Sequence, residues 1–238
     1  MLQPSEIERA LVITAHPDDV DFGAAGTVAW LTDHGVEVVY CLVTDGDAGG
    51  FDQTIPRPDM AAMRREEQTR AAKEVGVERL VFLGHGDGRV VYDLVLRRDL
   101  SRVIRQVRPT VVITQSPERN LDRIYASHPD HLATGEAAVA AVYPDARNPF
   151  AYPELIDEGL EAWTVPELWI MGGPGANAHV DVTDQVDRKI RALLRHETQH
   201  LDPSGVEQRV RTWMGMTASQ FGLPEGRCAE AFRVVDTR

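Results

Sequence analysis

The segment Leu11–Gly23, LVITAHPDDVDFG, passes directly from an apolar run into one imidazole and three carboxylates within six residues. Leu11 to Thr14 has the composition of a buried strand, and the charged residues begin where that strand should end. Ligands of open parallel sheets bind outside the carboxyl ends of the strands. The segment therefore predicts a strand that delivers charged side chains to a cleft at one edge of a sheet.

Apolar runs of the β type alternate with helical periodicity along the first half of the chain. Strands are expected at residues 11–14, 36–44, 80–83 and 110–114, and helices at 26–34, 59–75 and 94–107. Strands separated by helices form right-handed crossovers and a sheet covered on both faces. The fold class predicted is α/β, a Rossmann-like, mostly parallel sheet with helices on both faces and a mixed C-terminal portion.

The C-terminal portion mixes strands and helices, and no linker or repeat divides the 238 residues, so one domain is expected over 1–238. The further strands are expected at 167–171, 179–181 and 231–235, and the further helices at 185–200 and 206–220.

The helix expected at 185–200 carries a stripe that we expect to face the core, formed by Val186, Ile190 and Leu194. Three polar side chains share one flank of this helix, and they either border the cleft or form a half-buried edge: Lys189, His196 and His200.

The composition points to a small-molecule ligand. A formal net charge of −12 disfavours nucleic acid and anionic membranes as partners. No apolar run approaches the roughly 20 residues of a membrane span, and the N-terminus lacks the pattern of a signal peptide, so we expect a cytoplasmic protein. The two cysteines, Cys41 and Cys228, are expected to be reduced thiols.

The chemistry of the first charged segment favours a cation over a phosphate. The segment has no glycine-rich phosphate loop, and its carboxylates would repel phosphate. A second motif, His128-Pro129-Asp130-His131, follows the fourth expected strand, so it can face the first motif across the cleft. Imidazole and carboxylate donors together suit a borderline metal such as Zn²⁺, and three protein ligands with one open position are typical of a catalytic site.

Three segments carry a family resemblance: AHPDD at 15–19, HPDH at 128–131 and VDVTDQVDRKIRALLRHETQ at 180–199. Together they resemble the LmbE-like, or PIG-L, zinc-dependent N-deacetylases. The resemblance implies that His16, Asp19 and His131 bind the metal. It also implies that Asp18 is the general base that takes a proton from the metal-bound water.

Further roles follow from the same resemblance. His128 would steady the oxyanion and Asp130 would hold its ring, with the protonated form of His128 favoured by that carboxylate. Arg64, Asp87 and Tyr125 resemble positions that reach the substrate, although each could equally be an ordinary helix or loop residue.

One position departs from the family pattern. The family usually has Glu after the paired Asp residues, whereas this chain has Val20 followed by Asp21. Asp21 either substitutes as a brace for the loop or the brace is absent.

The implied reaction removes an acyl group, most often acetyl, from an N-acylated amino sugar. The alternatives are an amidase acting on a cysteine or thiol conjugate, a non-catalytic sugar-binding module, and an Fe²⁺ site for oxygen chemistry. Family members often form homo-oligomers, which leaves a homo-oligomer open here.

The substrate pocket is expected to be walled by the loops 116–127 and 144–166. Phe150, Tyr152 and Trp163 either stack on a sugar face or pack the second loop down.

Overall fold

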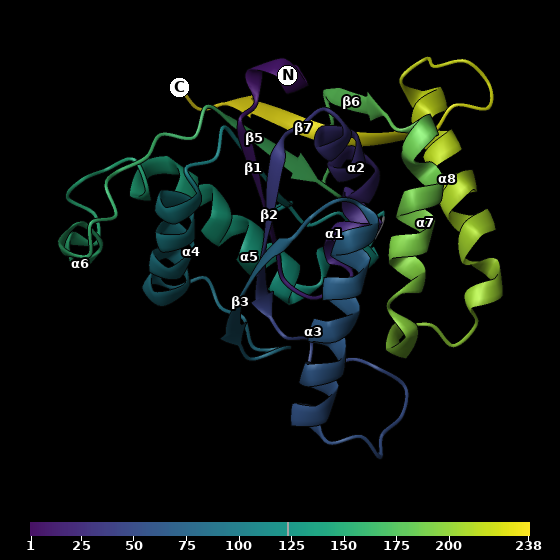
Figure 1. The fold of residues 1–238 in the computed structure, drawn as a ribbon, viewed down its shortest axis with the longest axis horizontal. Coiled ribbons are helices and arrows are strands. Elements are labelled where there is room, and N and C mark those ends of the chain that lie inside the picture. The colour runs from purple at the N-terminus through teal and green to yellow at the C-terminus, as the bar shows by residue number, and fades with distance from the viewer. Residues whose placement is uncertain (123) are drawn as a thin grey trace.

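The computed structural model describes residues 1–122 and 124–238, and these residues place seven strands in one sheet (Figure 1). The order across the sheet is β3-β2-β1-β4-β5-β7-β6. The strands are β1 (Arg9–Thr14), β2 (Glu37–Thr44), β3 (Arg79–His85), β4 (Val111–Gln115), β5 (Glu167–Met171), β6 (Ala178–Asp181) and β7 (Ala229–Asp236). The α-helices are α1 (Asp19–Gly23), α2 (Ala25–Asp33), α3 (Arg57–Glu74), α4 (Leu94–Val107), α5 (Pro129–Ala140), α6 (Pro153–Asp157), α7 (Val186–Leu194) and α8 (Val206–Gln220).

The first five strands along the sheet are parallel, while β7 runs antiparallel to both β5 and β6. The predicted α/β class with a mostly parallel sheet and a mixed C-terminal portion is confirmed. The strand order reverses direction at β1, which has β2 on one side and β4 on the other. A crevice opens at such a reversal point, so the residues after β1 and β4 are placed to share a ligand.

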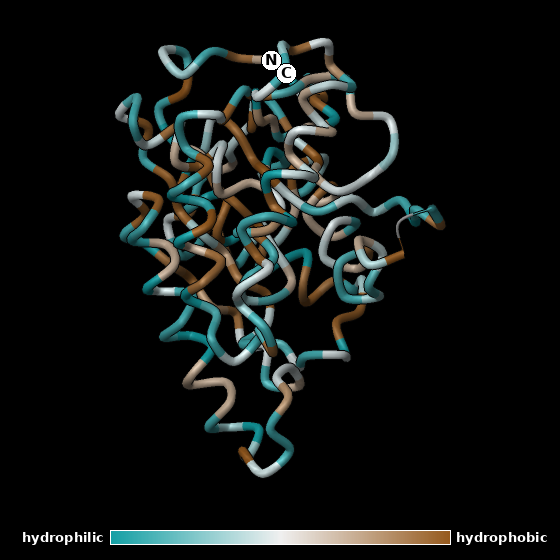
Figure 2. The backbone as a smooth tube through the Cα atoms, turned by 90° about the vertical axis from the view of Figure 1, so that its right-hand side faces the viewer, coloured by the Kyte–Doolittle hydropathy of each residue, from teal (hydrophilic) through white to brown (hydrophobic). Residues whose placement is uncertain are grey.

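Alternating side chains of each strand build two separate cores. Ala10 and Val12 of β1 pack into the core under α2, α3, α7 and α8, whereas Leu11 and Ile13 pack into the core under α4 and α5. Figure 1 shows α4 and α5 on one side of the strands, with α3, α7 and α8 on the other. In Figure 2 the brown, hydrophobic segments of the backbone gather in the middle of the molecule, and most of the teal, hydrophilic segments lie outside. Both faces are therefore covered, as continuous apolar strands require.

The helix predicted at 185–200 ends early, at Leu194, and the expected core stripe is wrong at its last position. Leu193 is buried, while Leu194 is 37% exposed. At about 100° per residue, Leu193 lies roughly 20° from Val186 around the helix, but Leu194 lies roughly 80° away. The chain leaves the helix at His196, which has φ −86° and ψ 61°.

No helix within residues 1–122 and 124–238 combines the length and the apolar character that crossing a bilayer demands.

Candidate active site and metal centre

The loop after β1 is fixed by hydrogen bonds before any ligand is considered. The backbone N–H of Ala15 donates to Gln115 Oε1 at 2.8 Å, and that of His16 donates to Asp19 Oδ2 at 2.7 Å. Asp18 has φ +84°, in the left-handed region, and its N–H donates to Gln68 Oε1 at 2.8 Å. Aspartate tolerates this conformation better than most residues. Because of this sharp turn, the neighbouring carboxylates contact different partners: Asp19 lies beside His16 and His131, and Asp18 lies beside Arg64.

Three side chains from the ends of β1 and β4 converge on one point. His16 Nδ1 lies 3.3 Å from Asp19 Oδ2 and 3.3 Å from His131 Nε2, and His131 Nε2 lies 3.0 Å from Asp19 Oδ1. His16 and Asp19 are provided by the loop and by α1, and His131 by the first turn of α5. We call His16, Asp19 and His131 the donor triad. The family resemblance implied these three residues as ligands, and the structure brings their side chains together.

The donor triad fits a tetrahedral metal ion. Ligands about 2.1 Å from such an ion lie roughly 3.4 Å from one another. The triad spacings of 3.0 to 3.3 Å match that value. Two imidazole nitrogens and one carboxylate are also the donor types that Zn²⁺ and similar metals take. Within the described residues, the imidazoles of His16, His128 and His131 also lie close enough together to share one ion.

The outer nitrogen of His16 is held by two carboxylates. His16 Nε2 lies 3.1 Å from Asp87 Oδ1 and 3.1 Å from Asp130 Oδ2. These three residues could also gather around a cation. However, the Asp130 carboxylate accepts the backbone N–H groups of Gly88 and Val90, so it is already engaged in hydrogen bonds. We therefore assign the carboxylates to orienting His16, the arrangement that metal-binding imidazoles usually have.

The charges of the donor triad balance each other. Burial alone would lower the pKa of His16, but the surrounding carboxylates, led by Asp19, raise it to about 12. Burial would raise the pKa of Asp19, yet His131 and His16 hold it well below its usual range. Burial would likewise lower the pKa of His131, and Asp19 raises it instead. A metal ion would take over the role of these imidazole protons, so its binding would release them.

Asp18 lies beside the triad in a different environment. Burial raises the pKa of its carboxyl to about 6, although the nearby Arg64 guanidinium opposes this change. Arg64 Nη2 is 3.4 Å from Asp18 Oδ2. A carboxylate whose pKa lies near neutrality can both take and return a proton, as general acid–base catalysis requires.

His128 differs from the sequence-based expectation. The Asp130 carboxylate bonds to His16, so the prediction that it holds the His128 ring is wrong. Instead, the backbone N–H of Asp130 donates to His128 Nδ1 at 3.2 Å, in the first turn of α5. Burial, followed by the charges of His16 and His131, lowers the pKa of His128, so its protonated form is not favoured. A neutral ring that accepts at Nδ1 carries its proton on Nε2.

A buried brace stands behind the first motif. Asp21 and His196 are both completely buried, and His196 Nε2 lies 2.8 Å from Asp21 Oδ2. Gln68 Nε2 donates to the same oxygen at 2.9 Å, while Gln68 Oε1 accepts the Asp18 N–H. Asp21 thus holds the loop in place, in the segment where this chain has Val20 and Asp21 instead of the Glu that the family usually has. Burial would lower the pKa of His196, but the hydrogen bond to Asp21 raises it.

Arg64 is not a solvated helix residue. It is 4% exposed, and it donates from Nη1 to the Gly46 carbonyl at 2.9 Å and from Nη2 to the Pro17 carbonyl at 2.6 Å. Gly46 has φ +70°, and a Cβ there would come within 2.3 Å of Arg64 Nη1. The glycine therefore lets Arg64 join the ends of β1 and β2.

The other two predicted substrate contacts, Asp87 and Tyr125, differ in burial. Asp87 is 8% exposed, and its two oxygens face His16 Nε2 and the backbone N–H of Ala48. Tyr125 is 89% exposed in the short 3-10 helix η2 (Ile124–Ser127), at the rim of the site. Lys189 and His200 do not border the cleft: Lys189 pairs with Glu230, and His200 Nε2 bonds the Leu193 carbonyl.

Two cavities meet at Asp19, His131 and Tyr125. The first, of about 290 Å³, is polar and includes Asp18, Arg64 and His128. The second, of about 330 Å³, has aromatic, thioether and small residues: Phe22, Gly23, Ala126, Met171, Gly172 and Trp213.

The loop 144–166 lines neither cavity, so its predicted role as a pocket wall is wrong. Its backbone carbonyls at 145, 146, 148 and 151 accept hydrogen bonds from the buried Arg105 of α4. Trp163 Nε1 bonds the Pro109 carbonyl and the Tyr152 hydroxyl bonds Asp145, so both aromatics pack the loop down. Figure 1 shows α6, within this loop, far from α7 and α8. Of the two predicted walls, only the loop 116–127 contributes, through Tyr125 and Ala126.

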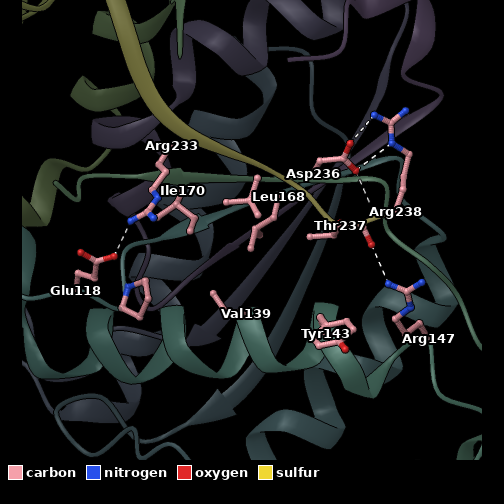
Figure 3. A pocket seen from close by; sticks show the side chains of 12 residues that line it. Glu118, Val139, Tyr143, Arg147, Leu168, Ile170, Arg233, Asp236, Thr237 and Arg238 are labelled. Atoms are coloured by element: carbon pink, nitrogen blue, oxygen red, sulfur yellow. Dashed lines mark hydrogen bonds and ion pairs between the residues drawn. The ribbon is translucent and has the colours of Figure 1, made fainter. Parts of the chain in front are cut away.

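A third cavity of about 520 Å³ lies elsewhere, between the β5–β7 face and α5, and shares no residue with the donor triad (Figure 3). Four of its charged side chains form two ion pairs, Arg233 with Glu118 at 2.8 Å and Arg238 with Asp236 at 2.7 Å, while Arg147 donates to the Thr237 carbonyl. Figure 3 shows apolar side chains such as Leu168 and Ile170 between these pairs. The residues that line this cavity include no histidine, so it lacks the combination of imidazoles and carboxylates found at the donor triad.

Two residues of the site were missed from the sequence. Gln68 follows Arg64 by four residues on α3, so a helical face that points Arg64 inward also points Gln68 inward. That spacing was available as a signal. Gln115 is the last residue of β4, where Thr114 and Gln115 after the apolar run Val111–Ile113 mark the strand end. His196 was among the residues named from the sequence, but the inward direction of its side chain depends on where α7 ends.

Comparison with known proteins settles the family. The PIG-L family, described as GlcNAc-PI de-N-acetylase, matches residues 11–142. The chain belongs to this family. The resemblance carried by the AHPDD and HPDH motifs is thus confirmed.

The relatives of this PIG-L protein include named deacetylases. A diacetylchitobiose deacetylase from Thermococcus kodakarensis is 32% identical over 232 residues, which is 97% of this chain and 84% of the relative. A probable N-acetyl-alpha-D-glucosaminyl L-malate deacetylase 2 from Bacillus anthracis is 30% identical, covering 79% of this chain and 80% of its own. The solved structure of N,N'-diacetylchitobiose deacetylase from Pyrococcus horikoshii, in complex with an inhibitor, matches with a TM-score of 0.90 at 30% identity, covering 98% of this chain and 85% of that one. The similarity covers nearly the whole chain, and it agrees with the prediction of an N-deacetylase.

Proposed function

We propose that this protein is a zinc-dependent N-deacetylase that hydrolyses the N-acyl amide of an amino sugar. The observation that carries the proposal is the convergence of the donor triad with Asp18 at the carboxyl ends of β1 and β4. The names of the relatives add a substrate class, because they describe deacetylases of N-acetylglucosamine conjugates.

The donor triad would hold the metal through His16 Nδ1, an Asp19 carboxylate oxygen and His131 Nε2. Two imidazoles and a carboxylate favour Zn²⁺, and Fe²⁺ suits the same donors. When bound, the ion would supply an acidified water and polarise the amide carbonyl. Asp87 and Asp130 keep the His16 ring turned so that Nδ1 faces the other two donors.

Asp18 moves the proton. Its carboxylate takes one proton from the attacking water and delivers it to the leaving nitrogen when the C–N bond breaks. The buried Arg64 guanidinium beside it holds the loop, and its charge favours the ionised form of Asp18 against the effect of burial. The hydrogen bond from the Asp18 N–H to Gln68 fixes the backbone at the base.

His128 would stabilise the negative charge that forms on the oxygen of the amide carbonyl. Because Nδ1 accepts the Asp130 N–H, Nε2 is the donor of the neutral ring. A neutral donor already in place can stabilise the negative oxygen that forms from the carbonyl without a proton being transferred first. This role as a hydrogen-bond donor replaces the charged imidazolium expected from the sequence.

Substrate would enter past Tyr125. The polar cavity, with Asp18, Arg64 and Asp87 in its wall, offers charged and polar partners for sugar hydroxyls. The exposed Tyr125 phenol stands at the rim shared by both cavities, where it can cover a bound substrate.

The test is release of the acyl group. Purified protein is incubated with N-acetylglucosamine and with N,N'-diacetylchitobiose, and free amine and acetate are measured before chelation, after chelation and after Zn²⁺ is restored. We expect activity that chelation abolishes and Zn²⁺ restores. Amine release that persists in full after complete metal removal contradicts the proposed mechanism, and no release with any metal contradicts the substrate class.

A further inference from the structure

The second cavity adds a feature that the proposed hydrolysis does not require. It meets the polar cavity at Asp19, His131 and Tyr125, so a bound substrate can extend into both. Two of the three shared residues belong to the donor triad. An amide placed at the triad therefore adjoins both compartments.

The two compartments differ in chemistry. The polar one includes Asp18, Arg64, Asp87 and His128. The other is lined mainly by Phe22, Ala126, Met171 and Trp213 with two glycines. Besides the three residues shared with the polar compartment, its wall includes the Gln115 amide, which already accepts the Ala15 N–H through Oε1. A sugar ring needs hydrogen-bond partners for its hydroxyls, whereas an alkyl chain needs only apolar surface.

We infer that the apolar cavity is an acyl-chain pocket and that the enzyme hydrolyses amino sugars carrying N-acyl groups longer than acetyl. This inference rests on the proposed function. The sugar occupies the polar compartment and the acyl chain the apolar one. The amide C–N bond breaks, the water oxygen bonds to the acyl carbon, and one water proton goes to the sugar nitrogen. The second water proton is released or taken up by the amine, and the products are the carboxylate of the chain and the amino sugar.

The size of the cavity supports this assignment. An acetyl methyl group occupies about the volume of one water molecule, ~30 Å³. The cavity measures about 330 Å³ and would leave most of its space unused by that group. Each further buried CH₂ group favours binding by about fourfold. Chains of about six carbons reach further along the surface formed by Phe22, Met171 and Trp213.

The experiment compares N-acetyl-, N-butanoyl-, N-hexanoyl- and N-octanoylglucosamine as substrates of the metal-loaded protein. We expect kcat/KM for the hexanoyl compound to exceed that for the acetyl compound by at least about tenfold. N,N'-diacetylchitobiose is included, because a second sugar ring is the other group of suitable size.

Two variants locate the effect. Ala126→Trp places bulk in the wall of the cavity and should reduce the hexanoyl-to-acetyl ratio of kcat/KM by at least about fivefold. Phe22→Ala removes an apolar wall and should reduce the same ratio even if the first variant folds poorly. The matched control is Ile124→Trp, on the same 3-10 helix as Ala126; Ile124 is 50% exposed and lines neither cavity. The control should keep the wild-type ratio.

The outcomes separate the two proposals. Acetate release with no gain for longer chains overturns the acyl-chain pocket and leaves the deacetylase function standing. A gain for the disaccharide that Ala126→Trp removes, with none for longer chains, assigns the cavity to a second sugar and also overturns the inference. Release of neither acetate nor longer acids from any substrate overturns both proposals.

Discussion

The buried brace behind the first motif can be tested by removing its central carboxylate. In Asp21→Ala, the side chain N–H groups of Gln68 and His196 lose the oxygen to which both are bonded at 2.9 and 2.8 Å. A buried donor left without a partner costs about 1–3 kcal/mol, so the two together predict a loss of roughly 2–6 kcal/mol. This is a large share of the 5–15 kcal/mol typical of a folded protein.

The matched variant is Asp21→Asn. Both donors bond to Oδ2, and Oδ1 has no hydrogen-bond partner among the described residues. An amide can therefore place its carbonyl at Oδ2 and keep both hydrogen bonds while it loses the charge. We expect Asp21→Asn to cost less than Asp21→Ala because both hydrogen bonds remain, although its NH2 group takes the partnerless position of Oδ1 and removes part of that advantage.

The assay is equilibrium urea unfolding of the metal-free proteins, followed by circular dichroism at several pH values. The hydrogen bond to Asp21 raises the pKa of His196 in the folded state, so the stability from this pair is fully present below the unfolded value of 6.5. That stability is lost as the pH rises through the folded pKa, and the gap between wild type and Asp21→Ala should narrow accordingly. A loss below about 1 kcal/mol for Asp21→Ala, or equal losses for both variants, refutes the brace.

Three further predictions concern the core and the reaction. Lys189 Nζ pairs with Glu230 Oε1 at 2.6 Å and both side chains are buried, so Glu230→Ala should cost about 3–5 kcal/mol in the same unfolding assay; a cost near zero contradicts the pairing. Gly135→Ala would bring a Cβ within 2.4 Å of the Gln115 carbonyl oxygen and should cost about 1–3 kcal/mol, with wild-type stability as the contrary result. The acid limb of kcat/KM should lie at or below about pH 6, because burial raises the pKa of Asp18 to about 6 and a bound cation lowers it again; a limb above pH 7 argues against Asp18 as the base.

The sequence predicted the parts of this molecule that follow from strand ends and periodicity. The motifs at 15–19 and 128–131 follow apolar strands, so the parallel sheet brings both motifs to one edge. The choice of His16, Asp19 and His131 as the ligands within those motifs came from the family resemblance. Arg64 lies on the inner face of a helix between two such strands. Its burial could be inferred only from the turn at Gly46 against which it packs.

Other features depended on geometry that no local pattern carries. The Asp130 carboxylate turns to His16 and not to its neighbour His128, because the first turn of α5 presents its backbone N–H to the His128 ring. The direction of His196 depends on the end of α7. The apolar cavity joins Phe22, Met171 and Trp213 from three separate elements, so it exists only after the sheet and α8 have packed together.

The central claim is that the donor triad holds the metal and Asp18 moves the proton. The most direct test measures, on the same purified samples, zinc per chain by elemental analysis and the rate of acetate release from N-acetylglucosamine. Wild type, Asp18→Asn and His131→Ala are compared. We predict about one zinc per chain with turnover for wild type, retained zinc with turnover lowered at least about a hundredfold for Asp18→Asn, and loss of both for His131→Ala. Full turnover in Asp18→Asn, or full zinc content in His131→Ala, would contradict the account.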